Sequence, residues 1–354
     1  MNTKSINRLI DSAKLLLVVV IACLLVSLII LSVSEEPGVA ISSFFLGPFT
    51  SLRRIGNIFE GAVPLIFTAL AVTLIFRAGQ FSMISEGSFF IGITGAMMVG
   101  IALPLPPVVH PAVALLTAGI FGAIAAAIPA LLKLKWQASE VVTSIMLNYI
   151  IQFFALYLVN YHFREPEASS LASLKIAESA ELPCIIPGTK VHLGLIIALV
   201  CCAVLWFYIF KTRQGFRIRL VGDNARFSSY VGIKSALVMV GAQILAGFVA
   251  GLGGGVEFLG MYTRFKWTSS PGYGWTGIAV ALLARRNPIL VPFAALFIAY
   301  LEVGSGIMAR SSDVSAEVVD IIQGVIMLMI AADALLQGWK QRLIVHSATE
   351  GGKA

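Results

Sequence analysis

The sequence predicts an all-α protein that crosses a membrane about ten times. Of its 354 residues, 58% are hydrophobic and only 12% are charged, with a mean hydropathy of +0.92. Soluble domains carry about 25% charged residues, and a chain this apolar is better solvated by a bilayer than by water. The net charge of +7 comes from cations at the ends of apolar segments, which indicates membrane topology and not nucleic-acid binding.

Ten apolar segments justify the count, and each is expected to be one helix. The first follows a basic N-terminal stretch and is too long for the core of a cleaved signal peptide, so we expect it to be retained. The eighth is too short to cross a core of about 30 Å at about 1.5 Å per residue, so it is either a broken helix or longer than drawn. The segments are 15–33, 57–77, 82–102, 110–132, 139–160, 191–210, 235–258, 273–284, 288–308 and 318–338.

Charge asymmetry sets the expected orientation. With the N-terminus in the cytoplasm, most of the 25 Lys and Arg residues fall on the inner side, as the positive-inside rule requires. Ten crossings then also place the C-terminus inside. The longest outer segment, 161–190, is expected to be an extracytoplasmic loop within a single transmembrane domain, 1–354. The block of segments two to five starts on the outer side, and the block of segments seven to ten starts on the inner side. Two four-helix blocks of opposite direction are the pattern of an inverted repeat.

The remaining motifs give no sign of chemistry on this chain. The four histidines have no metal-ligand spacing, three of the four cysteines lie in apolar segments, and no G-x-x-x-x-G-K-[ST] loop occurs. GYGWTG, 272–277, matches G-x-G-x-x-G but opens an apolar segment, so a tight turn and close packing are favoured over dinucleotide binding. The glycines spaced four apart from 247 to 255 predict close helix packing.

Polar side chains inside the membrane are candidates for a solute path. Glu140, Ser144, Asn148 and Gln152 stand four apart and therefore share one face of a helix. Gln243 and Gln323 lie within the seventh and tenth segments. The acidic residues fall toward segment ends, so amides without central carboxylates favour a neutral solute. The alternative is that these groups only form interhelical hydrogen bonds.

The segment 211–235 holds the densest group of cations, and topology alone does not explain the residues between them. Asp223 or Asn224 can cap a short helix over 225–230, with Gly222 and Gly232 marking its two ends. Such a helix presents Arg226, Phe227 and Tyr230 to a cytoplasmic partner. The alternative is an ordinary loop facing anionic lipids.

Four stretches together resemble the permeases of ABC importers for branched-chain amino acids, sugars and nucleosides. TRQGFRIRLVGDNARFSSYVGI (212–233) is similar to the family's cytoplasmic coupling segment. RAGQFSMISEGSFFIGITGA (77–96), SEVVTSIMLNYI (139–150) and GIAVALLARRNP (277–288) are similar to other family motifs, the second of them to the nucleoside branch. The departures Met83-Ile84-Ser85, Ser88 and Ser139 lie near the expected solute path and leave the solute open.

The resemblance implies a vitamin-B12-importer-type (type II) permease in a bacterial cytoplasmic membrane. It implies that two permeases, identical or related, form the path, that two ATPases bind ATP and magnesium, and that an extracytoplasmic binding protein or lipoprotein delivers the solute. The chain itself would not be an enzyme and would bind no cofactor, metal or nucleic acid. The expected coupling residues are Arg213, Gly215, Arg217, Arg219, Gly222, Asn224, Arg226, Phe227 and Gly232.

Nucleosides are the expected solute. Simple sugars, a riboflavin-like vitamin and branched-chain amino acids are the alternatives within the same class. A stand-alone secondary transporter or channel is the alternative from a different class. It would need a central acidic residue or a pore-lining ring, and neither is visible in the sequence.

Overall fold

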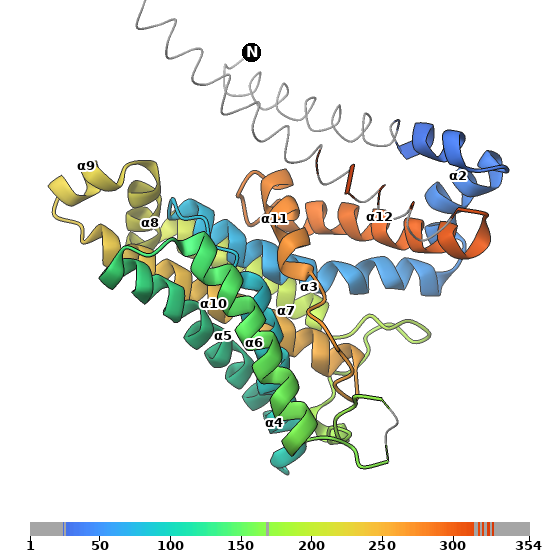
Figure 1. Ribbon diagram of the computed structural model, residues 1–354, viewed down its shortest axis with the longest axis horizontal. Coiled ribbons are helices and arrows are strands. Elements are labelled where there is room, and N and C mark those ends of the chain that lie inside the picture. The colour runs from blue at the N-terminus through green and yellow to red at the C-terminus, as the bar shows by residue number, and fades with distance from the viewer. Residues whose placement is uncertain are drawn as a thin grey trace, which may run out of the picture. The chain divides into compact units, whose positions relative to one another are not determined.

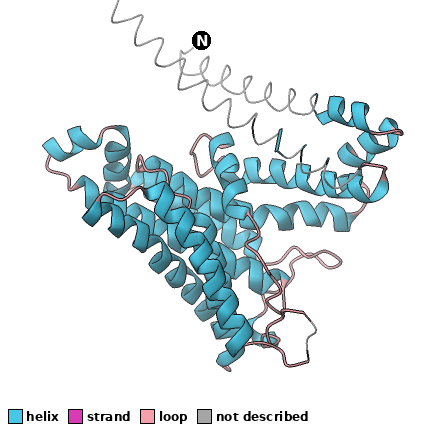
Figure 2. Ribbon diagram, in the orientation of Figure 1, coloured by secondary structure: helices cyan, strands magenta, loops and turns pink. Residues whose placement is uncertain are grey.

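A computed structural model describes residues 26–167 and 170–314, together with positions 24, 318, 321, 324, 325 and 328. Throughout these residues the regular elements are helices joined by loops (Figures 1 and 2). The predicted all-α class is therefore confirmed for the part of the chain that is described.

Seven helices in the described residues are long and apolar enough to span a membrane. They coincide with the second to seventh and the ninth predicted segments. The predicted first and tenth segments lie largely outside the described residues, so the count of ten stays a prediction. The seven helices are α3 (Leu52–Arg77), α4 (Ser85–Ala102), α5 (Val109–Trp136), α6 (Glu140–His162), α7 (Gly194–Lys211), α10 (Ser235–Met261) and α12 (Val291–Ser311).

The chain divides into two compact units, Met1–Arg54 with Tyr300–Ala354, and Ile55–Ala299. The first contains α2 (Pro37–Phe45) and the short 3-10 helix η1 (Gly47–Phe49), neither of which the sequence predicted. In this unit the Tyr300 hydroxyl donates to the Phe45 carbonyl at 2.9 Å. The Asp313 carboxylate accepts from the Ser34 hydroxyl and the Glu35 amide, each at 2.6 Å, and these bonds lower its pKa.

The second unit has α4, α5 and α10 at its centre, and these three helices make its most extensive contacts. Glycines let the backbones touch. A Cβ at Gly92 or Gly122 would overlap the backbone of α10, and one at Gly251 would overlap the Ala118 carbonyl of α5. Small residues allow this approach in a bilayer. The close packing predicted for 247–255 is therefore confirmed.

The eighth predicted segment is a half-length helix, α11 (Tyr273–Leu283). At about 1.5 Å per residue it covers about 16 Å, roughly half of a hydrocarbon core of about 30 Å. A non-helical stretch, 262–272, connects it to the end of α10. Gly272, with φ of 83°, is the N-cap of α11, so the predicted turn at GYGWTG is confirmed.

The loop between α6 and α7 packs on this non-helical stretch. The Ser173 amide donates to the Phe265 carbonyl and the Ile176 amide to the Thr263 carbonyl, both at 3.0 Å. His192, near the loop's end, is 1% exposed, and burial lowers its pKa to about 4. The loop and the stretch 262–272 therefore satisfy part of one another's backbone hydrogen-bonding groups.

Candidate coupling and solute-path elements

The segment 211–235 forms two short helices, each with a side-chain cap. The Thr212 hydroxyl accepts from the Gly215 amide at 3.0 Å and caps α8 (Arg213–Asp223). The Asn224 side chain accepts from the Phe227 amide at 2.9 Å and caps α9 (Ala225–Tyr230). The predicted helix over 225–230 is therefore confirmed, and Asn224 is its cap.

The helix α8, which precedes α9 in this segment, was not predicted. Its presence changes the role that was expected of Gly222. Gly222 does not mark an end of α9 but lies in the last turn of α8. Gly232, with φ of 86°, follows α9 as predicted. The sequence signal for α8 was Thr212, a residue type that favours the N-cap position. Its hydroxyl pairs the Gly215 amide, which would otherwise have no partner at the start of the helix.

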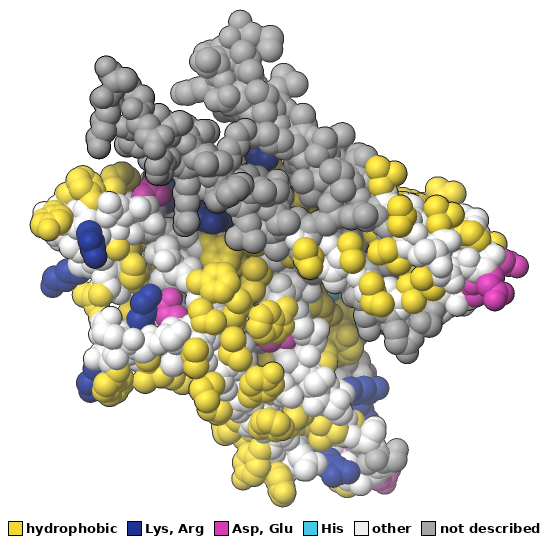
Figure 3. All heavy atoms as spheres, turned by 45° about the horizontal axis from the view of Figure 1, so that its top comes forward, with side chains coloured by type: hydrophobic (Ala, Val, Ile, Leu, Met, Phe, Trp, Pro, Cys, Tyr) yellow, Lys and Arg dark blue, Asp and Glu magenta, His cyan; other side chains and the backbone are white. Residues whose placement is uncertain are grey.

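The outer face of α9 is open to solvent in the single chain. Tyr230 is 91% exposed and Phe227 53% exposed. Arg226 is exposed as well, whereas Ser228 is fully buried on the inner face. Figure 3 shows cationic and hydrophobic side chains side by side at the end that carries α8 and α9. Aromatic and Arg side chains gathered on a short helix are typical of a protein-binding surface.

The inner face of α8 packs directly on the turn between α3 and α4. A Cβ at Gly222 would overlap the carbonyl oxygen of Arg77. Gly79, with φ of 70°, faces Gly222 across this contact, and its own Cβ would lie 3.0 Å from the Gly222 Cα. Gly215 makes a similar approach to α7, where a Cβ would overlap the Tyr208 carbonyl. Gly215 and Gly222 therefore have no room for a side chain, because each lies directly against the backbone of another element.

Three arginines, Arg77, Arg219 and Arg286, connect the region around the α3–α4 turn to neighbouring elements. The Arg77 and Arg219 guanidinium groups each lie 5.3 Å from the centre of the Phe210 ring. The Arg77 Nε donates to the Arg286 carbonyl at 2.9 Å, and the Arg286 guanidinium lies 5.6 Å from the Phe76 ring. Cation–π contacts of this kind stabilise by about 0.5–2 kcal/mol. Arg219 therefore holds α8 in place, while Arg213 and Arg217 are exposed on it.

The polar face of α6 binds the non-helical segment 80–84 and the start of α4. The Ser144 hydroxyl accepts from the Met83 amide at 3.0 Å. The Asn148 side chain donates to the Met83 carbonyl at 2.9 Å and accepts from the Gly87 amide at 3.0 Å. These bonds satisfy backbone groups that a helix would otherwise pair internally.

Two more of the predicted path residues bind the same segment. The Gln80 Nε2 donates to a Glu140 carboxylate oxygen at 2.7 Å, and Lys133 lies 2.7 Å from that same oxygen. The Gln243 Nε2 donates to the Ser82 hydroxyl at 3.2 Å. Side chains from α5, α6 and α10 thus converge on one short stretch of backbone.

The two other predicted path residues are placed differently. Gln152 lies one turn beyond Asn148 on α6 and is half-buried. Gln323 falls outside the described residues. Beside the polar face, α6 exposes aromatic side chains, among them Tyr149 at 61% and Phe153 at 65%.

Glu86 is a buried site residue that the sequence reasoning missed. It is 4% exposed in the first turn of α4. Its carboxylate accepts from the Gly272 amide at 2.8 Å and also from the Gly274 amide and the Ser270 hydroxyl. The start of a helix carries unpaired N–H groups and a partial positive charge, so Glu86 neutralises the start of α11. The available signal was an acidic residue in an apolar segment, together with a glycine-rich turn elsewhere.

The described part of the chain contains no group of three or more His, Cys, Asp or Glu side chains that could hold a metal ion. Apolar helices of spanning length enclose a mainly hydrophobic interior with a small set of buried polar side chains, and two short helices with side-chain caps carry an exposed face. These features define the class: a multi-pass membrane transport subunit.

The chain belongs to the family described as branched-chain amino acid transport system / permease component, whose model matches residues 54–331. It is thus an ABC transporter permease, in which ATP hydrolysis is carried out by a separate subunit.

Three curated relatives carry more specific names. A guanosine ABC transporter permease of Bacillus subtilis is 35% identical over 82% of this chain and 84% of its own length. A glucose ABC transporter permease of Haloferax volcanii is 30% identical over 88% and 84%. A nucleoside ABC transporter permease of Lactococcus lactis is 28% identical over 96% and 95%. No solved structure matches the chain.

Proposed function

We propose that this permease forms the membrane path of an ATP-driven importer for nucleosides. The names of two of the three relatives, guanosine and nucleoside permeases, support this solute class. The glucose permease keeps simple sugars as the second candidate. A nucleoside is neutral and rich in hydrogen-bonding groups, which amide and hydroxyl side chains can bind without introducing charge.

One observation carries the mechanism: α9 presents Arg226, Phe227 and Tyr230 outward while Gly222 holds α8 against the α3–α4 turn. We propose that 211–235 is the cytoplasmic coupling segment and that the exposed face of α9 docks on a partner ATPase, which binds ATP and magnesium. A second permease and an extracytoplasmic binding protein complete the transporter. ATPase closure would push α9, and through α8 the α3–α4 turn and the segment 80–84.

The polar residues on α6 and α10 are proposed to act through that segment. Asn148, Ser144, Glu140 and Gln243 hold the backbone between α3 and α4, so a movement of α8 would change the geometry that they bind. Gln152, and Gln323 in the tenth predicted segment, are proposed to contact the solute itself. Alternating access requires such a link between the coupling helix and the path.

The orientation is part of the proposal: both termini and 211–235 in the cytoplasm, and 161–190 outside. A single cysteine placed at exposed Ser170, in a chain whose native cysteines, including exposed Cys184, have been replaced, should react with an impermeant reagent from outside. One at exposed Ser229 should react only after permeabilisation. Ser229 is a better probe than its neighbour Ser228, which is buried. Labelling of Ser229→Cys from outside would contradict the orientation and the docking role together.

Co-purification with the partner ATPases tests the docking role. Phe227→Ala and Tyr230→Ala should each weaken ATPase association and slow guanosine uptake by roughly tenfold or more, as loss of an aromatic anchor at an interface does. Phe207→Ala, on the exposed face of α7 (58% exposed), is the matched control and should retain both. Glucose in place of guanosine tests the second solute candidate. Full ATPase association in both α9 variants would rule out docking through this face.

A further inference from the structure

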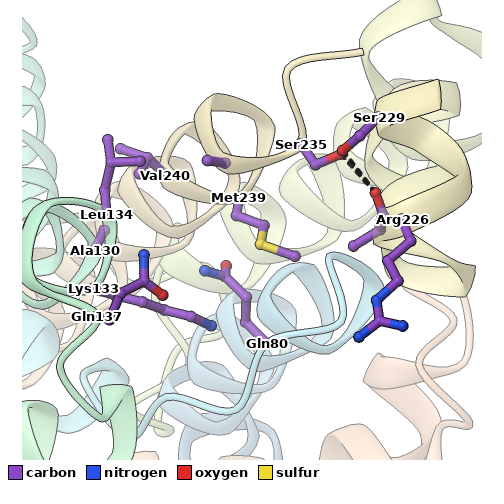
Figure 4. A pocket seen from close by; sticks show the side chains of 12 residues that line it. Gln80, Ala130, Lys133, Leu134, Gln137, Arg226, Ser229, Ser235, Met239 and Val240 are labelled. Carbon is purple, nitrogen blue, oxygen red and sulfur yellow. Dashed lines mark hydrogen bonds between the residues drawn. The ribbon is translucent and has the colours of Figure 1, made fainter. Parts of the chain in front are cut away.

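A cavity of about 340 Å³ lies between α9, the last turns of α5, the first turns of α10 and the segment after α3. Figure 4 shows side chains from all four elements around it. Small-molecule pockets typically measure about 300–1,000 Å³. The cavity therefore has the size of a binding site for one small molecule, and α9 forms one of its walls.

Gln80 provides a built polar group in this cavity. It is 5% exposed, and its Nε2 is held by Glu140 at 2.7 Å. Its Oε1 is buried and has no hydrogen-bond partner within the described chain. A buried acceptor left unpaired destabilises the folded protein. A ligand that donates a hydrogen bond to Oε1 would remove that penalty.

The other polar groups favour an anion. Lys133 and Arg226 line the cavity from opposite walls. Lys133 is paired with Glu140, whereas Arg226 is exposed beside the cavity. The first turn of α10 also faces the cavity through Ser235 and Ala236, and no side-chain hydrogen bond caps that turn. Unpaired amides at the start of a long helix bind phosphate groups well.

Apolar side chains complete the lining. Met239 and Val240 of α10 and Leu134 of α5 face the same space as the Gln80 amide (Figure 4). A ligand that suits all of these groups has a flat, apolar-faced ring with a hydrogen-bond donor on its edge and a phosphate at some distance from it.

We propose that this cavity binds a nucleoside monophosphate from the cytoplasm and that the bound nucleotide slows import. This inference rests on the proposed function, since phosphoryl transfer to a hydroxyl group of an imported nucleoside would produce such a nucleotide. The nucleotide would bridge α9 to α5, α10 and Gln80. A ligand that binds one conformation preferentially shifts the population toward it. Bound nucleotide would therefore oppose the movement of α9 that transport requires.

Binding of radiolabelled guanosine monophosphate to the complete reconstituted transporter is the first test. Met239→Trp fills the cavity and should weaken binding by at least about tenfold, which corresponds to about 1.4 kcal/mol. Leu134→Trp fills it from α5 and should do the same if Met239→Trp lowers the folded yield. Leu237→Trp is the matched control, because Leu237 lies outside this cavity, and it should bind as wild type does. Guanosine and inorganic phosphate should each compete far less well than the nucleotide.

Uptake of guanosine into vesicles is the second test. Vesicles loaded with ATP and the nucleotide should take up guanosine several-fold more slowly than vesicles loaded with ATP alone, and Met239→Trp should abolish the difference. Uptake by vesicles loaded with ATP alone reports the proposed function separately. No saturable nucleotide binding would overturn the inference, and so would equal competition by phosphate alone. Slowing that persists in Met239→Trp would also overturn it, because the nucleotide would then be acting on the ATPases. If Met239→Trp stops uptake into vesicles loaded with ATP alone and no nucleotide binds, the cavity is an ATPase contact and the inference is wrong.

Discussion

Two non-helical segments interrupt the bundle, one before α4 and one before α11, and they are held in different ways. Neutral groups bind the backbone of the first, at Met83, through Ser144 and Asn148, while the Glu140 carboxylate binds this segment only through the Gln80 side chain. Gly222 of α8 touches the turn that precedes this segment. A carboxylate, Glu86, holds the end of the second. Neutral hydrogen bonds each contribute about 0.5–1.5 kcal/mol, and bonds to a charged group about 1.5–3 kcal/mol. The backbone of the segment joined to the coupling helices is thus held by the weaker bonds of the two.

The two segments meet at the first turn of α4. Gly87 is bound by Asn148, and its neighbour Glu86 binds the start of α11. A displacement at the first segment therefore reaches the second through one residue. The comparison suggests a division of roles, in which the segment before α4 moves and the start of α11 stays fixed. Three substitutions test this division, in order of expected effect, and a change of pH then tests the outer loop.

Glu86→Ala should have the largest effect on folding, because it removes the carboxylate that binds the start of α11. It leaves the Gly272 and Gly274 amides buried without an acceptor, at about 1–3 kcal/mol each. We expect loss of most folded permease, measured as monodisperse protein after extraction. Glu86→Gln keeps one acceptor oxygen and should give an intermediate yield. A normal yield and melting temperature for Glu86→Ala would show that the start of α11 is not held in this way.

Gly222→Ala should come next, because a Cβ there overlaps the Arg77 carbonyl. The protein should still insert, since the contact lies at a helix end, but guanosine uptake should fall by at least about tenfold, the effect of a barrier raised by about 1.4 kcal/mol. Gly241→Ala in α10 is the control, because a Cβ at Gly241 meets nothing within 4 Å. If both variants transport equally well, α8 does not drive the α3–α4 turn.

Asn148→Leu should reduce uptake per assembled complex several-fold while binding of solute by the external protein stays unchanged. Its side-chain amide makes one bond to Met83 in the segment 80–84 and one to Gly87 in the first turn of α4, and leucine makes neither. Gln152→Leu, one turn away, tests direct solute contact. Uptake must be normalised to assembled complex, because a packing defect would lower assembly instead. Near-normal values for both variants would exclude α6 from the path.

The last test uses pH, not a substitution in the path, and it concerns the stability of the outer loop that supports the second segment. Burial lowers the pKa of His192 to about 4, whereas an unfolded histidine titrates near about 6.5. The unfolded state therefore binds more protons between these values, and stability falls as pH drops below about 6.5. Between pH 7 and pH 5 we expect a loss of roughly 2 kcal/mol, measured as a lower melting temperature. His192→Asn should flatten this dependence, and an equal slope in that variant would assign the effect to other groups.

The sequence predicted the helices well because hydrophobic length and polar ends are local properties. The α9 helix was predictable for the same reason: the Asn224 cap and Gly232 lie next to it. What could not be predicted are contacts between distant residues. Nothing local to Gly222 shows that Arg77 lies against it, and nothing local to Glu86 shows a helix start near 272. The amides on α6 were recognised as unusual, but their partners at 83–87 emerged only from the packing.

The pairing of Glu86 with the start of α11 has a consequence for biosynthesis. Gly272 follows Glu86 by 186 residues, and ribosomes add about 5–20 residues per second. The carboxylate is therefore made roughly 10–40 s before its partners exist. An ionised carboxylate without a partner is costly in a bilayer, and less so near a helix end, where Glu86 lies, than at the centre. During that interval the start of α4 is better solvated at the membrane surface, and synthesis of α11 supplies the partners that let it be buried.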